Sequence, residues 1–299
     1  TVRATTQSDG TVITTVLPVS TNRHDDPISL SSQYADIPVT NNSTGDTLLT
    51  VSLPTGVGLN IAGKSQSLSL QAASNDITQR IAQKTGSNSS LTQEIINHAQ
   101  NFLATLAADE RVTVQAITPS ISNNQLLDVP IIITGSNSNS DDQQMLIVDA
   151  GNLPSGTTIQ LDNVAFASII GAARVVGGNG ENFVVGDNQN QYIVLGTDDD
   201  TLFGGGGNDT IGSLAGNDQT SGDAGDDIVF GGTGNDLLSG GTGNDQLNGG
   251  FGFDSVSQEG QLSDYQVATQ GSVITLTQSS GEVDTFTDVE LIRFTTGSS

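Results

Sequence analysis

Residues 204–212 read GGGGNDTIG, residues 231–239 read GGTGNDLLS and residues 240–248 read GGTGNDQLN. These three stretches belong to one period of nine residues that runs from residue 177 to residue 257 without an insertion. The sixth position of the period is Asp in seven successive repeats, and the eighth is apolar in every repeat except the one with Thr220. Self-similarity at a fixed period is the signature of a repeat architecture, so this segment predicts a stack of similar structural units.

Each repeat combines a turn with a short strand. Consecutive glycines followed by Asn suit a turn whose backbone adopts positive φ angles. The apolar eighth position then points one side chain inward, so two successive repeats make one full coil. Stacked coils lie about 4.8 Å apart, a spacing that lets a Ca²⁺ ion contact oxygens about 2.4 Å away on both sides. The expected metal ligands are Asp200, Asp209, Asp218, Asp227, Asp236, Asp245 and Asp254.

Asp residues two repeats apart are expected to share one ion. The expected pairs are Asp200 with Asp218, Asp209 with Asp227, Asp218 with Asp236, Asp227 with Asp245, and Asp236 with Asp254. Backbone carbonyls of the turns would complete each site. Asn182 and Gln191 replace Asp in the first two repeats, so sites that depend on them should be weak or absent.

The pattern G-G-x-G-x-D-x-U-x resembles the RTX (repeats-in-toxin, haemolysin-type) calcium-binding family. The resemblance implies a parallel β-roll that binds Ca²⁺. It also implies type I export from a Gram-negative bacterium in an unfolded state, with folding outside the cell. A solvated acidic tract of low complexity is disfavoured, because it would not need an apolar residue at the eighth position.

The charge distribution agrees with a cation-binding segment. The chain has 299 residues, no Cys and a formal net charge of −25. Residues 177–257 hold 13 acidic residues and no Lys or Arg. This acidity argues against nucleic acid as a partner, because phosphates need clustered Lys and Arg. No apolar run is long enough to predict a membrane span.

The fold class we expect is mostly β: a calcium-binding parallel β-roll or β-solenoid with a C-terminal β cap and a small mixed, mainly β N-terminal domain. We expect the N-terminal domain at 1–150, an uncalcified solenoid lead-in at 151–176, nine repeats at 177–257 and the cap at 258–299. The period of nine extends upstream to Val175 and Phe166 at the apolar position. That residues 157–193 instead belong to a separate domain stays open.

The cap is expected from a hairpin signal. Tyr265, Val267, Val273 and Leu276 flank a turn at Gln270-Gly271. The stretch 263–294 also resembles the short β module that often follows RTX repeats, with an S-D-Y-x-V start and a V-E-x-x-R-F end. A cap protects the exposed strand edge of the last coil.

Two helices are expected before the repeats. Ser90 can cap a helix near 90–108 with Gln93 three residues on. The apolar stripe of this helix comprises Leu91, Ile95, Ala99, Phe102, Leu103 and Leu106. A shorter helix is expected over 75–84, ending before Gly86.

Residues 58–65 match G-x-x-x-x-G-K-[ST], the phosphate-binding loop. That loop must lie between a strand and a helix, yet residues 66–70 alternate like a strand. Lys64 is therefore expected to be a solvated lysine. Protease and lipase signatures are absent. The only histidines are His24, expected in a loop, and His98, expected at the surface or boundary of the helix. No catalytic residue is predicted.

We therefore expect a secreted, non-catalytic Ca²⁺-binding β-solenoid protein with a structural or adhesive role at the cell surface or in a matrix, fibre or surface layer. Its partners would be calcium ions, further copies of itself or cell-surface components, without nucleic acid or membrane insertion. One alternative is an accessory calcium-binding region of a larger secreted hydrolase, and a minor one is nucleotide binding at Gly58–Ser65. Because the chain begins at Thr1, we expect a processed form or an excised fragment.

Overall fold

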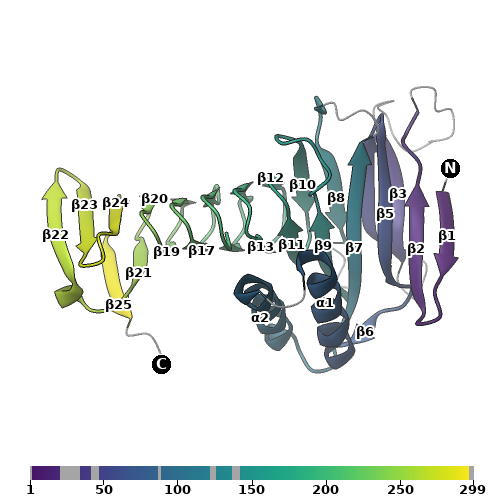
Figure 1. The fold of residues 1–299 in the computed structure, drawn as a ribbon, viewed down its shortest axis with the longest axis horizontal. Helices are drawn as coiled ribbons and strands as arrows, with labels where there is room; N and C mark the ends of the chain where they lie inside the picture. The colour runs from purple at the N-terminus through teal and green to yellow at the C-terminus, as the bar shows by residue number, and fades with distance from the viewer. Residues whose placement is uncertain are drawn as a thin grey trace.

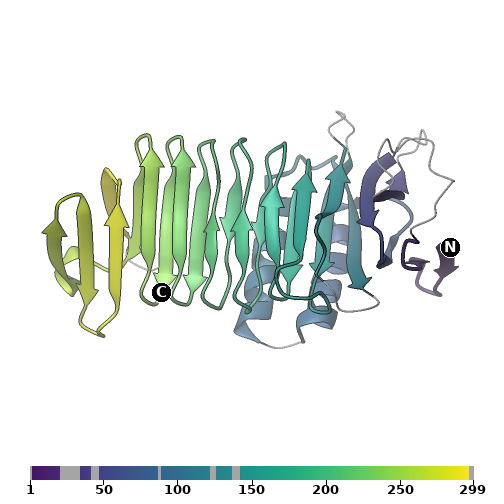
Figure 2. The ribbon, with the colours of Figure 1, turned by 90° about the horizontal axis from the view of Figure 1, so that it is seen from above.

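The computed structural model describes residues 2–20, 34–41, 47–86, 89–121, 126–136 and 142–295. The molecule is elongated: a two-layered β structure runs along its length, and two helices cover one face near the N-terminal end (Figure 1). Viewed from above, parallel strands follow one another along the long axis with the helices behind them (Figure 2). None of the described helices has the length and apolarity that a membrane span requires.

Two long sheets form the layers. Sheet A contains, in spatial order, β1 (Val2–Thr6), β2 (Thr11–Val16), β5 (Val57–Lys64), β7 (Arg111–Ile121), β9 (Asp142–Asp149), β11 (Phe166–Ile170), β13 (Phe183–Val185), β15 (Thr201–Phe203), β17 (Gln219–Ala224), β19 (Leu237–Thr242), β21 (Ser255–Glu259) and β25 (Leu291–Thr295), with β6 (Leu68–Ser69) beside β7. Sheet B contains β22 (Tyr265–Gln270), β23 (Val273–Gln278), β24 (Val283–Thr287), β20 (Gln246–Phe251), β18 (Ile228–Thr233), β16 (Thr210–Gly212), β14 (Tyr192–Val194), β12 (Arg174–Gly177), β10 (Thr158–Asp162), β8 (Ile131–Gly135), β4 (Thr47–Pro54) and β3 (Tyr34–Asn41).

Each nine-residue repeat contributes one strand, alternately to sheet A and to sheet B. Strands two repeats apart pair in parallel, as in Leu202 with Thr220 and Ile211 with Val229. The side chains at the eighth position, Thr220 included, are buried between the two sheets. The predicted β-roll is confirmed. Its core consists of one row of buried side chains from each sheet, with one side chain from each repeat.

The coils continue upstream of the acidic repeats. β10 to β14 pair in parallel with their neighbours and extend both sheets. Val175 faces the interior as predicted, but the placement of Phe166 was wrong. Ala167, not Phe166, pairs with Val184 and fills the interior, because the step from β11 to β13 is one residue shorter than two full repeats. Phe166 consequently points outward and packs against the helices.

Helices α1 (Leu70–Thr85) and α2 (Ser90–Thr105) confirm the two helices expected, with α1 longer than predicted. The Ser89 side chain, one residue before the predicted cap, accepts the hydrogen bond from Thr92 N–H. Both helices pack on the outer face of sheet A. Phe102 of α2 contacts Phe166 and Phe183, with ring centroids 5.4 and 5.7 Å apart.

Sheet A and sheet B run from the N-terminal strands into the coils without interruption. β7 already pairs in parallel with β9, and β9 with β11. The strands that precede β10 therefore form the base on which the coils stack. The expected boundaries at residues 150, 176 and 257 stay predictions.

The C-terminal residues close the roll with a hairpin and a last coil. β22 and β23 form the predicted antiparallel hairpin, in which Val267 lies opposite Leu276. β24 then pairs in parallel with β20, and β25 with β21. The last coil of the repeats is thus covered on both sheets, which agrees with a capping role.

Gly234 illustrates why the turns need glycine. Its φ is 142°, and a Cβ there would overlap the carbonyl oxygen of Gly216 in the adjacent coil. We expect Gly234→Ala to destabilise the calcium-loaded protein by about 2–4 kcal/mol, the range for backbone strain with steric overlap. Gly271→Ala is the control, since it has φ 65° with open space around it and should cost only about 1 kcal/mol. Urea unfolding at saturating Ca²⁺ measures both, and equal losses would contradict this account of the turns.

Candidate metal centre

The acidic side chains of the repeats form two columns, one at each edge of the roll. Each carboxylate accepts a hydrogen bond from the backbone N–H of the residue one coil before it. For example, Asp209 N donates to Asp227 Oδ1 at 2.7 Å and Asp218 N donates to Asp236 Oδ1 at 2.8 Å. One column contains Asn182, Asp200, Asp218, Asp236 and Asp254, and the other contains Gln191, Asp209, Asp227 and Asp245. The structure thus places the two members of each expected pair in adjacent coils, and their sharing of an ion stays a prediction.

The second carboxylate oxygen of these residues is buried without a hydrogen-bond partner among the described residues. This holds for Oδ2 of Asp209, Asp218, Asp227, Asp236, Asp245 and Asp254. A buried acceptor left unpaired costs about 1–3 kcal/mol, and more when it is charged. Six such atoms in periodic positions therefore fit a positively charged ligand.

Glycine leaves the space beside these oxygens. A Cβ at Gly222 would collide with Oδ2 of Asp227, and a Cβ at Gly231 would collide with Oδ2 of Asp236. The same relation, five positions before the carboxylate, recurs for Asp209, Asp245 and Asp254. Among these six acids, only Asp218 has a different neighbour there, Ser213.

Burial makes ionisation of these carboxyls unfavourable. Desolvation raises the pKa of Asp209, Asp218 and Asp245 to about 7, and that of Asp200 and Asp227 to about 6. Charges in adjacent coils add to the rise, as Asp200 and Asp236 do for Asp218. The pKa values of Asp236 and Asp254 are also raised by burial.

The first members of the columns differ chemically from the rest. The Asn182 amide donates to the carbonyl of Val164 at 2.9 Å, and the Gln191 amide donates to the carbonyl of Gly171 at 2.9 Å. These neutral side chains supply a hydrogen bond where later coils have a carboxylate. Asp200 Oδ2 also has partners, since Gly196 N and Ser213 Oγ donate to it. Weak or absent sites at this end stay a prediction, and the Ser213 contact supports it.

The columns end on two cap residues that lie outside the nine-residue frame. Asp245 N donates to Asp284 Oδ1 at 3.1 Å, and Asp254 N donates to Glu290 Oε2 at 2.7 Å. Asp284 is buried, and burial raises its pKa. Sequence reasoning placed these residues in the cap without giving them a role in the columns. A sequence signal for a further coil was present in the alternating D-T-F-T stretch (residues 284–287), where Phe286 occupies the inward position.

The donor set fits a hard cation. Ca²⁺ prefers six to eight oxygen ligands from carboxylates and backbone carbonyls, in flexible geometry. Residues 177–257 supply buried carboxylate oxygens and no sulfur, no imidazole and no cationic side chain. A family model for the RTX calcium-binding nonapeptide repeat, in four copies, matches residues 185–219 and 221–256. Residues 185–256 are RTX calcium-binding repeats.

The match covers the RTX segment and leaves the rest of the chain unassigned. No curated protein matches the chain. No solved structure matches it either. The RTX repeats establish a calcium-binding β-roll, and the residues that hold each ion are proposed from the geometry above.

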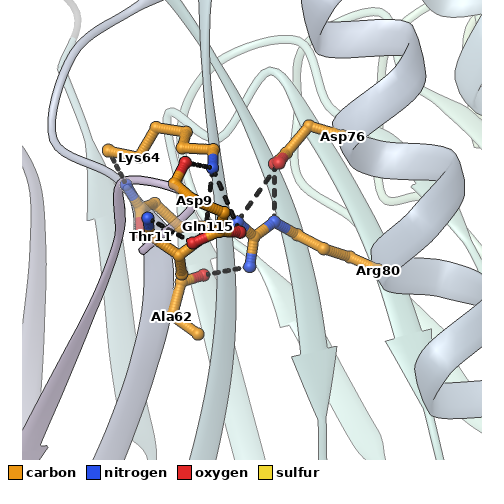
Figure 3. Close-up of polar contacts among 7 residues, drawn as sticks. All are labelled: Asp9, Thr11, Ala62, Lys64, Asp76, Arg80 and Gln115. Atoms are coloured by element: carbon orange, nitrogen blue, oxygen red, sulfur yellow. Dashed lines mark hydrogen bonds and ion pairs between the residues drawn. The ribbon is translucent and has the colours of Figure 1, made fainter. Parts of the chain in front are cut away.

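The G-x-x-x-x-G-K-S match is not a phosphate-binding loop. Residues 57–64 form β5, an interior strand of sheet A between β2 and β7. Lys64 Nζ donates to the Asp9 carbonyl at 2.7 Å and to Thr11 Oγ1 at 3.1 Å (Figure 3). The lysine side chain thus contacts the turn between β1 and β2. The next helix begins only at Leu70, and its Arg80 is paired with Asp76 (Figure 3). The structure gives the minor nucleotide-binding alternative no support, because no helix begins directly after the motif.

Proposed function

We propose that this chain is a secreted β-roll protein that folds when it meets extracellular calcium and then serves as a rigid structural or adhesive element. The observation that carries the proposal is the set of six buried, unpartnered carboxylate oxygens in two columns of the described residues. Asp200 and Asp284 extend those columns at the two ends. The proposed ligands are Asp200, Asp209, Asp218, Asp227, Asp236, Asp245 and Asp254, with Asp284 and Glu290 completing the last sites.

Calcium would make folding of the chain depend on whether it is inside or outside the cell. Without the ion, carboxylates in adjacent coils repel each other and the coils lose their main cross-link. Extracellular calcium modules bind at about 10⁻⁴–10⁻³ M, a concentration range found outside cells and not in the cytosol. A chain with these sites would stay unfolded during export and fold after it.

The two ends of the molecule support self-association. β1 is exposed along its whole length and pairs only with β2 among the described strands. At the other end β22 is largely exposed and pairs only with β23 among them. Unprotected edge strands are templates for pairing with another chain, so copies of this chain could join end to end into fibres or layers.

Light scattering tests the assembly part of this proposal. We expect the full chain at millimolar Ca²⁺ to form species larger than a monomer, and chelation to disperse them. Val267→Lys, on the exposed face of β22, should reduce assembly, because a lysine on an edge strand opposes pairing. Leu262→Lys is the matched control, since Leu262 is similarly exposed but lies in the short helix before the strand. A monomer at every calcium concentration would contradict the assembly proposal and leave calcium-driven folding standing.

The alternative of an accessory region of a larger secreted hydrolase stays a prediction. One pocket in the N-terminal part, with a volume of about 650 Å³, is lined by Lys64 and Arg111. Both cations are already paired within the chain, Lys64 with Asp9 and Arg111 with the Ser67 carbonyl. No nucleophile with an adjacent base lines this pocket among the described residues, so its lining gives the hydrolase alternative no support.

A further inference from the structure

Three side chains distant in sequence converge where α2 lies over the roll. Glu94 and His98 are on α2, and Asp223 is on β17. One carboxylate oxygen of each acid and one imidazole nitrogen all lie within 4.8 Å of one another. All three side chains are half-buried. The group lies outside the two columns, since Asp223 is not at the sixth position of its repeat.

The fold holds each of the three in place. Glu94 and His98 are four positions apart, so they share one face of the helix. The His98 ring packs on Phe203 of β15, with centroids 3.8 Å apart. Asp223 accepts a hydrogen bond from Ser221 Oγ at 2.6 Å, which leaves its other oxygen with only a long contact of 3.3 Å to Gly205 N. In the folded roll these atoms are thus positioned by contacts within the protein.

The charge of this group is not balanced by the protein. Neither Glu94 nor His98 has a hydrogen bond or ion pair within the described part of the chain, although both are half-buried. The cavity beside them, about 380 Å³, is lined by a third acid, Glu259, and by no Lys or Arg. Two adjacent carboxylates in such surroundings favour a bound cation.

We propose that Glu94, His98 and Asp223 form a binding site for one Zn²⁺ ion that joins α2 to the RTX roll. An imidazole nitrogen with two carboxylate oxygens is a donor set that Zn²⁺ accepts. Ca²⁺ requires more oxygens and does not favour imidazole. The neighbouring cavity leaves room for a water molecule as the fourth ligand. The site rests on the proposed calcium-driven folding, because Asp223 belongs to a coil between two calcium columns.

Titration calorimetry with Zn²⁺ on the full chain, saturated with Ca²⁺, tests this site. Calcium keeps the columns occupied, so zinc reports on other positions. We expect one equivalent of Zn²⁺ to bind. His98→Ala, Glu94→Gln and Asp223→Asn should each weaken that binding at least tenfold, since even removal of groups behind metal ligands costs about 10–100-fold. Asp109→Asn, an exposed acid one turn beyond α2, is the charge-matched control and should bind as the unchanged chain does.

Circular dichroism of each variant at saturating Ca²⁺ separates loss of the site from loss of the fold. A variant that keeps the full β signal and loses the zinc equivalent supports the proposal. Absence of a zinc equivalent in the folded, calcium-loaded chain would overturn it, as would equal zinc affinity in all three variants and the unchanged chain. If the chain does not fold with Ca²⁺ at all, the failure lies with the proposed calcium-driven folding.

Discussion

Replacing Asp227 by Asn is expected to raise the Ca²⁺ concentration needed to fold the protein by about tenfold or more. Ligand charge sets calcium affinity over several decades, and this substitution removes one carboxylate charge from the middle of a column. Asn keeps the oxygen that accepts the hydrogen bond from Asp209 N. It replaces the unpartnered Oδ2 with an N–H₂ group that repels a cation. The loss is therefore one of charge and coordination, with little change in shape.

The adjacent residue provides the control for this prediction. Asp226 is exposed, and its carboxylate accepts hydrogen bonds from the backbone and side chain of Asn244, both at 2.9 Å. Asp226→Asn makes the same chemical change in the same repeat outside the column. The midpoint of calcium-induced folding, followed by circular dichroism, should move little for Asp226→Asn and strongly for Asp227→Asn. Equal midpoints for the two variants would show that the columns do not hold the ions.

The second large effect is an opposite response to pH with and without calcium. The buried carboxyls have pKa values of about 6 to 7 in the folded chain, above their ordinary value of 3.8. A group whose pKa is raised by folding contributes stability below its unfolded pKa and loses that contribution as pH rises through the folded pKa. The metal-free roll should therefore gain stability as pH falls from about 8 to about 4.

With calcium the direction reverses, because protons and Ca²⁺ compete for the same oxygens. We expect the calcium midpoint to rise as pH falls through about 7 to about 5. Far-ultraviolet circular dichroism of the chelated protein from pH 8 to pH 4 measures the first response, and calcium titrations at the same pH values measure the second. A β signal in the chelator that falls on acidification would contradict the burial of neutral carboxyls. Asp227→Asn should flatten both responses, since it removes one titrating group.

The repeats could be predicted from sequence because every position in them has one local cause. Glycine permits the turn, Asp faces the edge and the eighth residue fills the interior, so counting by nine places each of them. Counting fails where the coil length changes. Phe166 lies on the helix side of sheet A, because the coil between β11 and β13 is one residue shorter than the later coils.

Other parts depend on contacts that counting in the nine-residue frame does not place. Asp284 and Glu290 join the columns only because the hairpin of β22 and β23 comes between the last repeat and the final coil. His98 was expected at the surface or boundary of the helix and is half-buried, but its proximity to Phe203 and Asp223 was not expected. The expected role of His24 lies outside the described residues.

Adding Ca²⁺ to chelated protein and following far-ultraviolet circular dichroism shows whether calcium drives the folding of the RTX roll. We predict a weak β signal in the chelator and a cooperative gain at about 10⁻⁴–10⁻³ M Ca²⁺. Mg²⁺ at the same concentration should not produce that gain, since it demands a smaller, octahedral site. A β signal that is already complete in the chelator at neutral pH, or that stays unchanged at millimolar Ca²⁺, would contradict calcium-driven folding.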